Sequence, residues 1–387
     1  MAAAAPARAL APAQIVEEAE PKTESPPGFL SRIAWFTILL CGVLIFEFNS
    51  ELRLATDFSG PSAPGHFSLL AAGGSSRTQV WDHGEWWRLF TSTALHGSPD
   101  HLIGNLIALA AAGFLLEPIV GLGWFAAVYF IGGLSGAILS TVLNPADLQS
   151  VGASGAIMAC LATTFCLSFH AGARSPRLMR RVAGVLLFPA MIPSVSDGGA
   201  ITDLSAHLGG FVAGMVMAFA ILIAWPDEDD RLPGRSFAAL LAGGLLALTV
   251  WAFVQSANSY DKYAQKGFDF IPAADMPATE DAMRAQSYQL VDKYPKDPRA
   301  HFFRGLYFLE QNDLNDAEPH LREAIKLGEQ NPGVMGPRFL TWSKAMLALD
   351  VHGLGRPDEA RTIAAPVCGA EATEEVEMLK KNNLCPG

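Results

Sequence analysis

The chain has 387 residues, of which half are hydrophobic and only 17% are charged. Its mean hydropathy of +0.26 is too high for a soluble enzyme with a normally charged surface, so the composition predicts a membrane protein. The net charge of -11 argues against nucleic acid as a partner, because binding to phosphates needs a concentrated surface of lysine and arginine.

The first 30 residues are rich in alanine, proline and glutamate. They contain no apolar stretch after a basic start, so they resemble neither a signal peptide nor a typical transit peptide. We expect residues 1–30 to form a disordered cytoplasmic tail.

Seven hydrophobic stretches follow this segment, and most reach the length of about 20 residues that a helix needs to cross a bilayer. They lie at residues 32–48, 102–118, 123–143, 154–171, 182–195, 205–225 and 236–256. The fourth and fifth are short, and short spans interrupted by glycine are tolerated where they line a cavity inside a bundle.

The arginines between the fourth and fifth stretches set the expected orientation, because cytoplasmic loops carry an excess of basic residues. They are Arg174, Arg177, Arg180 and Arg181. Counting crossings from this loop places the N-terminus in the cytoplasm. We expect the chain to be a multi-pass protein of the inner cell membrane. If residues 236–256 also cross, everything after residue 256 lies outside the cytoplasm.

Residues 257–387 have an ordinary soluble composition, with 15 basic and 20 acidic residues. A pattern of small and apolar residues resembles a 34-residue tetratricopeptide repeat of two antiparallel helices. It consists of Gly305, Phe308, Ala317, Leu321 and Ala324, with Pro332 closing it. We expect two or three such units and a peptide or protein partner for them; the alternative is a small helical domain of another kind.

Two of the five cysteines, Cys368 and Cys385, lie outside the apolar stretches. The expected orientation places them in an oxidising space, where disulfides persist. The sequence therefore predicts a disulfide between them, with two free thiols as the alternative.

The candidate chemistry begins with Ser154, in the segment Gly152 to Gly155 that opens the fourth stretch. A glycine-rich serine motif alone is weak evidence, because glycine and serine commonly pack between membrane helices. His207 in the sixth stretch adds weight, since an ionisable residue inside a span is a functional candidate. Gly210 and Gly214 share its helix face and permit close helix approach, which would bring Ser154 and His207 together. The alternative is a neutral imidazole satisfied by a backbone carbonyl.

His101 and Asn105 form a third feature at the start of the second stretch. A spacing of four places both side chains on one helix face, at the depth where Ser154 begins its helix. Both can donate hydrogen bonds. Helix capping or interfacial polarity is the alternative, but it explains Asn105 poorly.

Together these motifs resemble those of the rhomboid intramembrane serine proteases. The resemblance covers roughly residues 30–225 and includes further matching positions in the expected order. These are Trp87 with Arg88, Glu117 with Gly121, and Gly132, Gly133 and Gly136. The family usually has an aromatic residue four positions after the serine, where this chain has Met158; a thioether can still pack on an imidazole.

The resemblance implies an all-α polytopic helix bundle, with a rhomboid core of six helices at residues 31–225. A cytoplasmic linker and a seventh span would occupy residues 226–256, and a soluble helical-repeat domain residues 257–387. The resemblance also implies Ser154 as nucleophile, His207 as its base, and His101 with Asn105 as oxyanion donors. The expected substrates are transmembrane segments of other proteins, cleaved without cofactor or metal.

Other functions remain open at this point. A non-catalytic rhomboid-like protein could bind membrane-protein clients, although such proteins typically lack the serine or the histidine, and both are present here. A transporter would need charged or paired polar residues deep in several spans, and the third and fourth stretches have none. Asp203 lies one turn before His207; we expect a loop or gating role for it rather than that of a triad acid.

Overall fold

The computed structural model describes residues 33–60, 62–146, 148–170, 173, 175–193, 202–225, 232–272, 275–277, 279–331, 334, 337–369 and 374–385. The expected N-terminal tail lies outside these residues, as do Arg174 and Pro332.

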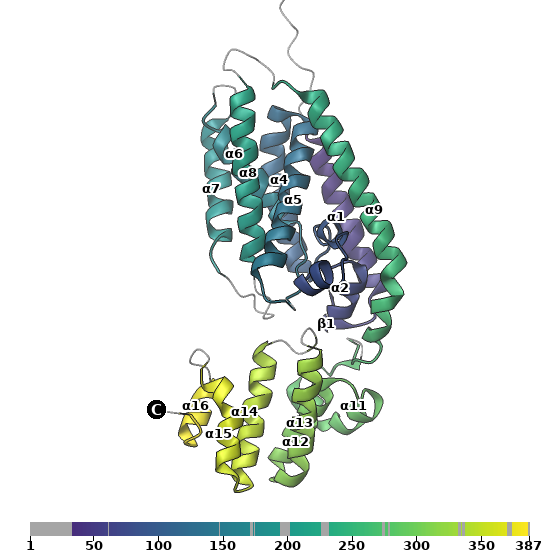
Figure 1. Ribbon diagram of the computed structural model, residues 1–387, viewed down its shortest axis with the longest axis vertical. Helices are drawn as coiled ribbons and strands as arrows, with labels where there is room; N and C mark the ends of the chain where they lie inside the picture. Colours follow the sequence, from purple (N-terminus) through teal and green to yellow (C-terminus); the bar gives the residue numbers. More distant parts are fainter. Residues whose placement is uncertain are drawn as a thin grey trace, which may run out of the picture. The chain divides into compact units, whose positions relative to one another are not determined.

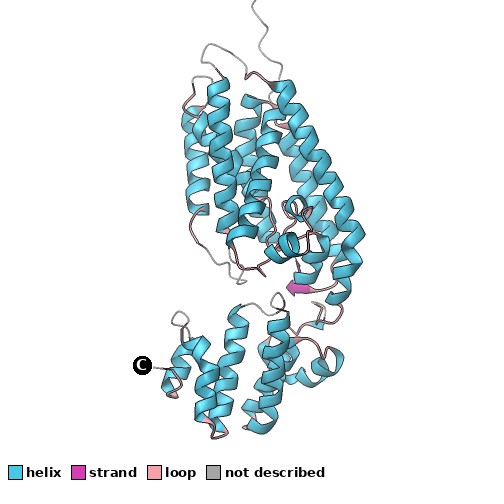
Figure 2. Cartoon of the chain, in the orientation of Figure 1, coloured by secondary structure: helices cyan, strands magenta, loops and turns pink. Residues whose placement is uncertain are grey.

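Helices dominate the described chain, as predicted (Figure 2). Each of the seven hydrophobic stretches overlaps one helix, and these helices are labelled in Figure 1. Their bounds are α1 (Trp35–Leu54), α4 (Pro99–Val120), α5 (Leu122–Leu143), α6 (Ser154–Leu167), α7 (Pro176–Ala190), α8 (Leu204–Ala224) and α9 (Arg235–Gly267). The fold class is therefore the expected all-α membrane bundle followed by further helices.

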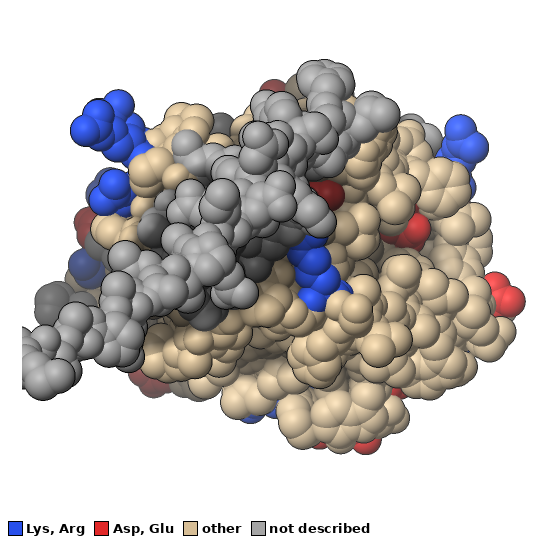
Figure 3. Space-filling view, turned by 90° about the horizontal axis from the view of Figure 1, so that it is seen from above, with Lys and Arg blue, Asp and Glu red and all other residues tan. Residues whose placement is uncertain are grey.

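Five of these helices, α1, α4, α5, α8 and α9, are long and apolar enough to span a membrane. Helix α6 is apolar but has only 14 residues, and α7 has 15. Large apolar side chains point outward from the bundle, among them Phe46, Phe219 and Leu240. In the view of Figure 3, the surface of the described residues is largely tan, with basic and acidic side chains at scattered places. Outward-facing apolar side chains of this kind suit a lipid environment.

Small residues bring α6 and α8 into direct backbone contact, as the glycine pattern predicted. A methyl group on Gly210 would clash with the carbonyl oxygen of Gly155, and one on Gly214 would clash with the backbone of Ala159. In the same way, a methyl group on Gly132 of α5 would clash with the side chain of Ala159. These three helices can approach so closely only because glycine has no side chain.

The segment between α1 and α4 folds over one end of the bundle in short elements. They are β1 (Phe58–Gly60), β2 (Ala63–Pro64), α2 (His66–Ala72), a π-helical turn (Thr78–Asp82) and α3 (Arg88–Thr91). The two strands pair antiparallel, with Phe58 opposite Pro64.

Helix α9 continues eleven residues beyond the expected end of the seventh stretch at residue 256, to Gly267. Its last turns are held against the α1–α4 segment by hydrogen bonds. Ser256 Oγ donates to the carbonyl of Ala72 (2.7 Å), Tyr260 donates to the carbonyl of Leu54, and Thr56 Oγ1 donates to the carbonyl of Ala264 (2.9 Å). These contacts explain why the helix persists after its apolar sequence ends.

Most of the described residues after α9 are also helical. The helices are α10 (Glu280–Ala285), α11 (Ser287–Lys293), α12 (Pro298–Glu310), α13 (Leu314–Gln330), α14 (Pro337–Gly353), α15 (Pro357–Cys368) and α16 (Glu374–Lys381). Gly305 of α12 lies against the side chain of Leu321 in α13, where an added methyl group would come within 2.7 Å. The predicted disulfide between Cys368 and Cys385 is present, with the two Cα atoms 5.5 Å apart.

Candidate active site

Ser154 is the first residue of α6, and the backbone immediately before it is unusual. Gly152 has a φ of +134°, a conformation that favours glycine because it has no Cβ. Its N–H donates to the carbonyl of Ser92 over 2.9 Å, which fixes the turn against the segment before α4. The serine therefore stands at a helix N-terminus, where backbone N–H groups and the helix dipole favour negative charge.

His207 lies in the first turn of α8 and is 8% exposed. Its Nδ1 is 2.7 Å from the carbonyl oxygen of Ala190, the last residue of α7. A carbonyl can only accept, so Nδ1 carries the hydrogen and Nε2 keeps its lone pair. The carbonyl-bound imidazole of the alternative interpretation is therefore present, and Nε2 has no hydrogen-bond partner among the described residues.

The neighbours of Ser154 and His207 are in contact across the α6–α8 interface. A methyl group on Gly155 would lie 3.2 Å from the carbonyl oxygen of Ala206. Among the hydrogen bonds of the described residues, none joins Ser154 to His207. The structure therefore places the two segments together without a closed hydrogen bond between the side chains, as is common before substrate binds.

His101 and Asn105 of α4 both reach the turn before Ser154. A methyl group on Gly152 would lie 2.9 Å from His101 Nε2 and 3.7 Å from Asn105 Nδ2. The structure thus brings all four sequence-predicted residues to one region, from α4, α6 and α8.

Two further residues of this region were not predicted from the sequence. His96 is fully buried, and its Nε2 lies 3.0 Å from Asn105 Nδ2. Its backbone N–H lies 3.2 Å from both carboxylate oxygens of Glu51 in α1. The signals in the sequence are weak: His96 lies five residues before His101, and Glu51 is an acidic residue just after the first hydrophobic stretch.

Asp203 does not act as a triad acid in this arrangement, because the His207 nitrogen that such an acid would hold is bonded to Ala190. Its carboxylate instead caps α8 by accepting from the N–H of Ala206 (2.9 Å). It also accepts from the hydroxyls of Ser140 and Ser150, both over 2.6 Å. Asp203 therefore ties α5 and the loop before Ser154 to the start of the His207 helix.

Arg88 anchors the segment between α1 and α4. Its guanidinium is fully buried, donates to the carbonyls of Leu70 and Gly74, and stacks over the ring of Tyr263 in α9. Glu85 pairs with Arg88 over 2.6 Å. Burial raises the pKa of Glu85, but hydrogen bonds from Lys262, Tyr263 and Arg88 outweigh it, so the pKa lies below its usual range. The pair is therefore ionised at neutral pH.

Sequence comparison relates the chain to known proteins. The model of the rhomboid domain matches residues 83–224. Rhomboid protease GluP of Bacillus subtilis is 30% identical over 207 residues, which are 53% of this chain and 38% of that protein. YdcA, a further rhomboid relative from Bacillus subtilis, is 30% identical over 138 residues, which are 35% of this chain and 68% of that protein.

The chain belongs to the rhomboid family. Rhomboid-like protease 5 of Toxoplasma gondii is 32% identical over 187 residues, 46% of this chain and 22% of that protein. The chain thus spans well under half the length of GluP and of this protease. The family match, together with the apolar helices, identifies a multi-pass membrane protein related to intramembrane proteases.

Proposed function

We propose that this rhomboid protein is an intramembrane serine endopeptidase that uses Ser154 as nucleophile and His207 as base. The observation that carries the proposal is the 2.7 Å bond from His207 Nδ1 to the carbonyl of Ala190. It leaves the Nε2 lone pair on a helix that packs against the start of α6. A serine hydroxyl is a weak nucleophile until such a base takes its proton.

In the proposed reaction Ser154 Oγ attacks the scissile carbonyl while His207 Nε2 takes the hydroxyl proton. The protonated imidazole then gives this proton to the leaving amine, and an acyl-enzyme remains. Water, deprotonated by the same nitrogen, hydrolyses the ester and regenerates both side chains. No third acid is needed, because the carbonyl of Ala190 already fixes the tautomer of His207.

The oxyanion formed in both halves of the reaction needs donors that are already in place. The backbone N–H of Ser154, the ring of His101 and the amide of Asn105 serve this purpose in our proposal. The last two lie beside Gly152, two residues before the nucleophile.

The substrates we propose are transmembrane segments of other membrane proteins. Backbone amides in an intact helix are already hydrogen-bonded, so a segment must unwind before it is cleaved. We further propose that the protein lies in the inner membrane of the cell, with the N-terminus cytoplasmic and residues 257–387 outside. These last residues would form a tetratricopeptide-like domain that binds a peptide or protein partner.

The test is cleavage of a generic single-span substrate by the purified protein in detergent. We expect Ser154→Ala and His207→Ala each to abolish cleavage while the protein still folds. Ser168→Ala is the matched control, because Ser168 follows the other end of α6 and, among the described residues, its hydroxyl donates to the carbonyl of Phe165. Cleavage within tenfold of wild type in either site variant would refute the dyad, and a wild-type protein without cleavage would favour a client-binding role.

A further inference from the structure

We propose that His96 and Glu51 are positioning residues, which hold the Asn105 amide with its NH₂ group toward the turn before Ser154. The proposal rests on the proposed function, since Asn105 matters only if an oxyanion forms there. It concerns residues on α1 and on the loop before α4, neither of which contributes to the proposed dyad.

The imidazole of His96 can accept at Nε2 because of its other hydrogen bond. Its Nδ1 lies 3.2 Å from the carbonyl oxygen of Ala94, which can only accept, so Nδ1 carries the hydrogen. Burial, followed by the nearby His101, lowers the pKa of His96 to about 3. The ring is therefore neutral at physiological pH, and Nε2 presents a lone pair to Asn105.

This lone pair selects one of the two orientations of the Asn105 amide. The amide nitrogen lies 3.0 Å from Nε2 and donates to it. The flipped amide would place its oxygen against the same lone pair, where no hydrogen bond can form and two acceptors repel. His96 thus keeps the NH₂ group of Asn105 on its own side.

The amide nitrogen of Asn105 also faces the proposed oxyanion site. Nδ2 is the Asn105 atom nearest to a methyl group placed on Gly152, at 3.7 Å. An amide nitrogen has two hydrogens, and among the described residues only His96 binds one of them through the side chain. The second remains for a group at the turn before Ser154. A flipped amide would offer an acceptor there and would repel an oxyanion.

Glu51 holds the backbone of His96 in place. Its carboxylate is 4% exposed, and both oxygens lie 3.2 Å from the His96 N–H. The carboxylate belongs to α1, whereas the amide precedes α4, so the contact fixes the Ala94–His96 turn to a different helix.

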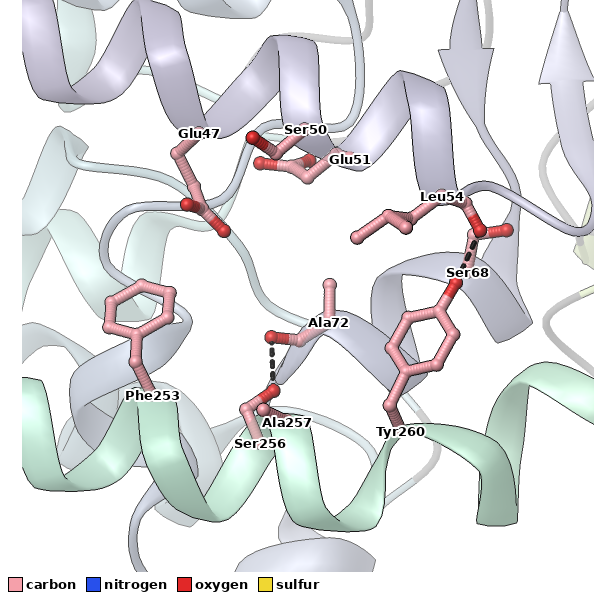
Figure 4. A pocket seen from close by; sticks show the side chains of 10 residues that line it. All are labelled: Glu47, Ser50, Glu51, Leu54, Ser68, Ala72, Phe253, Ser256, Ala257 and Tyr260. Atoms are coloured by element: carbon pink, nitrogen blue, oxygen red, sulfur yellow. Dashed lines mark hydrogen bonds between the residues drawn. The ribbon is translucent and has the colours of Figure 1, made fainter.

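Figure 4 shows where Glu51 lies relative to its nearest acidic neighbour, Glu47. Both line a cavity of about 130 Å³ between α1, α2 and α9, opposite Phe253 and Tyr260. Glu47 is one helical turn from Glu51 in the same cavity. Among the described residues it has no hydrogen bond or ion pair. Glu47 is therefore a matched control for removing a carboxylate from this place.

The experiment measures kcat and KM for the full-length protein in detergent with a single-span substrate. We expect His96→Ala to lower kcat by about 10- to 100-fold with KM within about twofold. The reason is that the Asn105 amide, which would bind the oxyanion only in the transition state, is then misdirected. His96→Gln should recover most of this loss, since a glutamine oxygen can accept from Asn105. Glu51→Ala should lower kcat by about tenfold and Glu47→Ala should not.

The decisive measurement is the double variant of His96→Ala with Asn105→Ala. If His96 acts only through Asn105, the double variant loses no more kcat than Asn105→Ala alone. The proposal is overturned if the kcat losses of the two single variants multiply in the double variant. It is also overturned if His96→Ala changes KM and not kcat, or if Glu47→Ala and Glu51→Ala lower kcat equally. If the wild type cleaves through Ser154 while His96→Ala retains its kcat, only the positioning proposal fails. A wild type that does not cleave removes both.

Discussion

Two histidines of the site use the same hydrogen-bond pattern for different purposes. His207 and His96 each donate from Nδ1 to a backbone carbonyl two or more residues away, that of Ala190 or Ala94. Each ring therefore presents Nε2 as an acceptor. In His96 this acceptor is already bonded to Asn105, whereas no partner of His207 Nε2 is found among the described residues. Of these two rings, only that of His207 has an acceptor nitrogen without a hydrogen-bond partner among the described residues.

Replacing Asn105 with alanine tests the oxyanion assignment at the level of one residue. We expect turnover to fall by about 10² to 10³ with little change in substrate affinity, because the donor acts on charge that exists only in the transition state. Steady-state kinetics with a single-span substrate measures both quantities. A variant that loses affinity and keeps its turnover would identify Asn105 as a packing or substrate-contact residue.

For single residues, the sequence could indicate candidate site residues where their spacing places them on one helix face. His101 and Asn105 are four apart, and Ser154 stands in a recognisable glycine motif. Glu51 could not be predicted in the same way, because it binds the backbone of a residue 45 positions away. A backbone amide has no sequence signature, so such a contact appears only in the fold.

Individual helices were predicted from apolar length, and their contacts from small residues. The Gly210 and Gly214 pattern correctly indicated a close approach of α8 to α6. Helix α9 continues eleven residues beyond the apolar stretch, which apolar length could not indicate because these last turns are polar. They stay helical through bonds such as that from Tyr263 to Glu85 (2.7 Å), which depend on how the α1–α4 segment folds.

Adding one methyl group at the α6–α8 contact should damage both stability and activity. A Cβ at residue 210 would clash with the carbonyl of Gly155, next to Ser154. We expect Gly210→Ala to lower the free energy of unfolding by about 1–3 kcal/mol or more and to reduce cleavage strongly. Gly42→Ala on α1 is the control, because nothing lies within 4 Å of its added methyl group. Thermal unfolding in detergent distinguishes them, and equal melting temperatures would contradict the proposed close contact.

We expect Asp350 of α14 to make the stability of the C-terminal helices depend on pH. It is 1% exposed, and neither carboxylate oxygen has a hydrogen-bond partner within the described chain. Burial, followed by the charge of Glu318, raises the pKa of Asp350 to about 7, although Arg322 and Arg356 oppose this rise. A raised pKa means that the folded form binds the proton more tightly than the unfolded form.

The stability contributed by protonated Asp350 is therefore complete below about pH 4 and is lost as the pH rises toward 7. We expect Asp350→Asn to stabilise the protein by roughly 2 kcal/mol at pH 8 and much less at pH 5. Chemical unfolding of the full chain, followed through the C-terminal helices, measures the difference. A gain of the same size at both pH values would show that titration of Asp350 is not its cause.

For the whole molecule, the separation of apolar and charged sequence predicted a membrane bundle followed by helices of ordinary composition. The orientation of the chain in the membrane is a separate matter, because it rests on the arginine-rich loop and on an odd number of crossings. That number depends on α7 and on α9. Helix α7 has 15 residues, whereas α9 has 33 and is apolar enough to span.

The disulfide between Cys368 and Cys385 provides a test of that orientation. A covalent link closing 17 residues could stabilise the C-terminal helices by about 3 kcal/mol in the chain-entropy model, and such links persist outside the cytoplasm. A variant in which Cys41, Cys160 and Cys166 are alanine leaves these two as its only cysteines. We expect a membrane-impermeant thiol reagent to label this variant in intact cells only after treatment with an impermeant reductant. Labelling that requires broken cells would instead place the C-terminal helices in the cytoplasm, which means an even number of crossings, so that either α7 or α9 does not span.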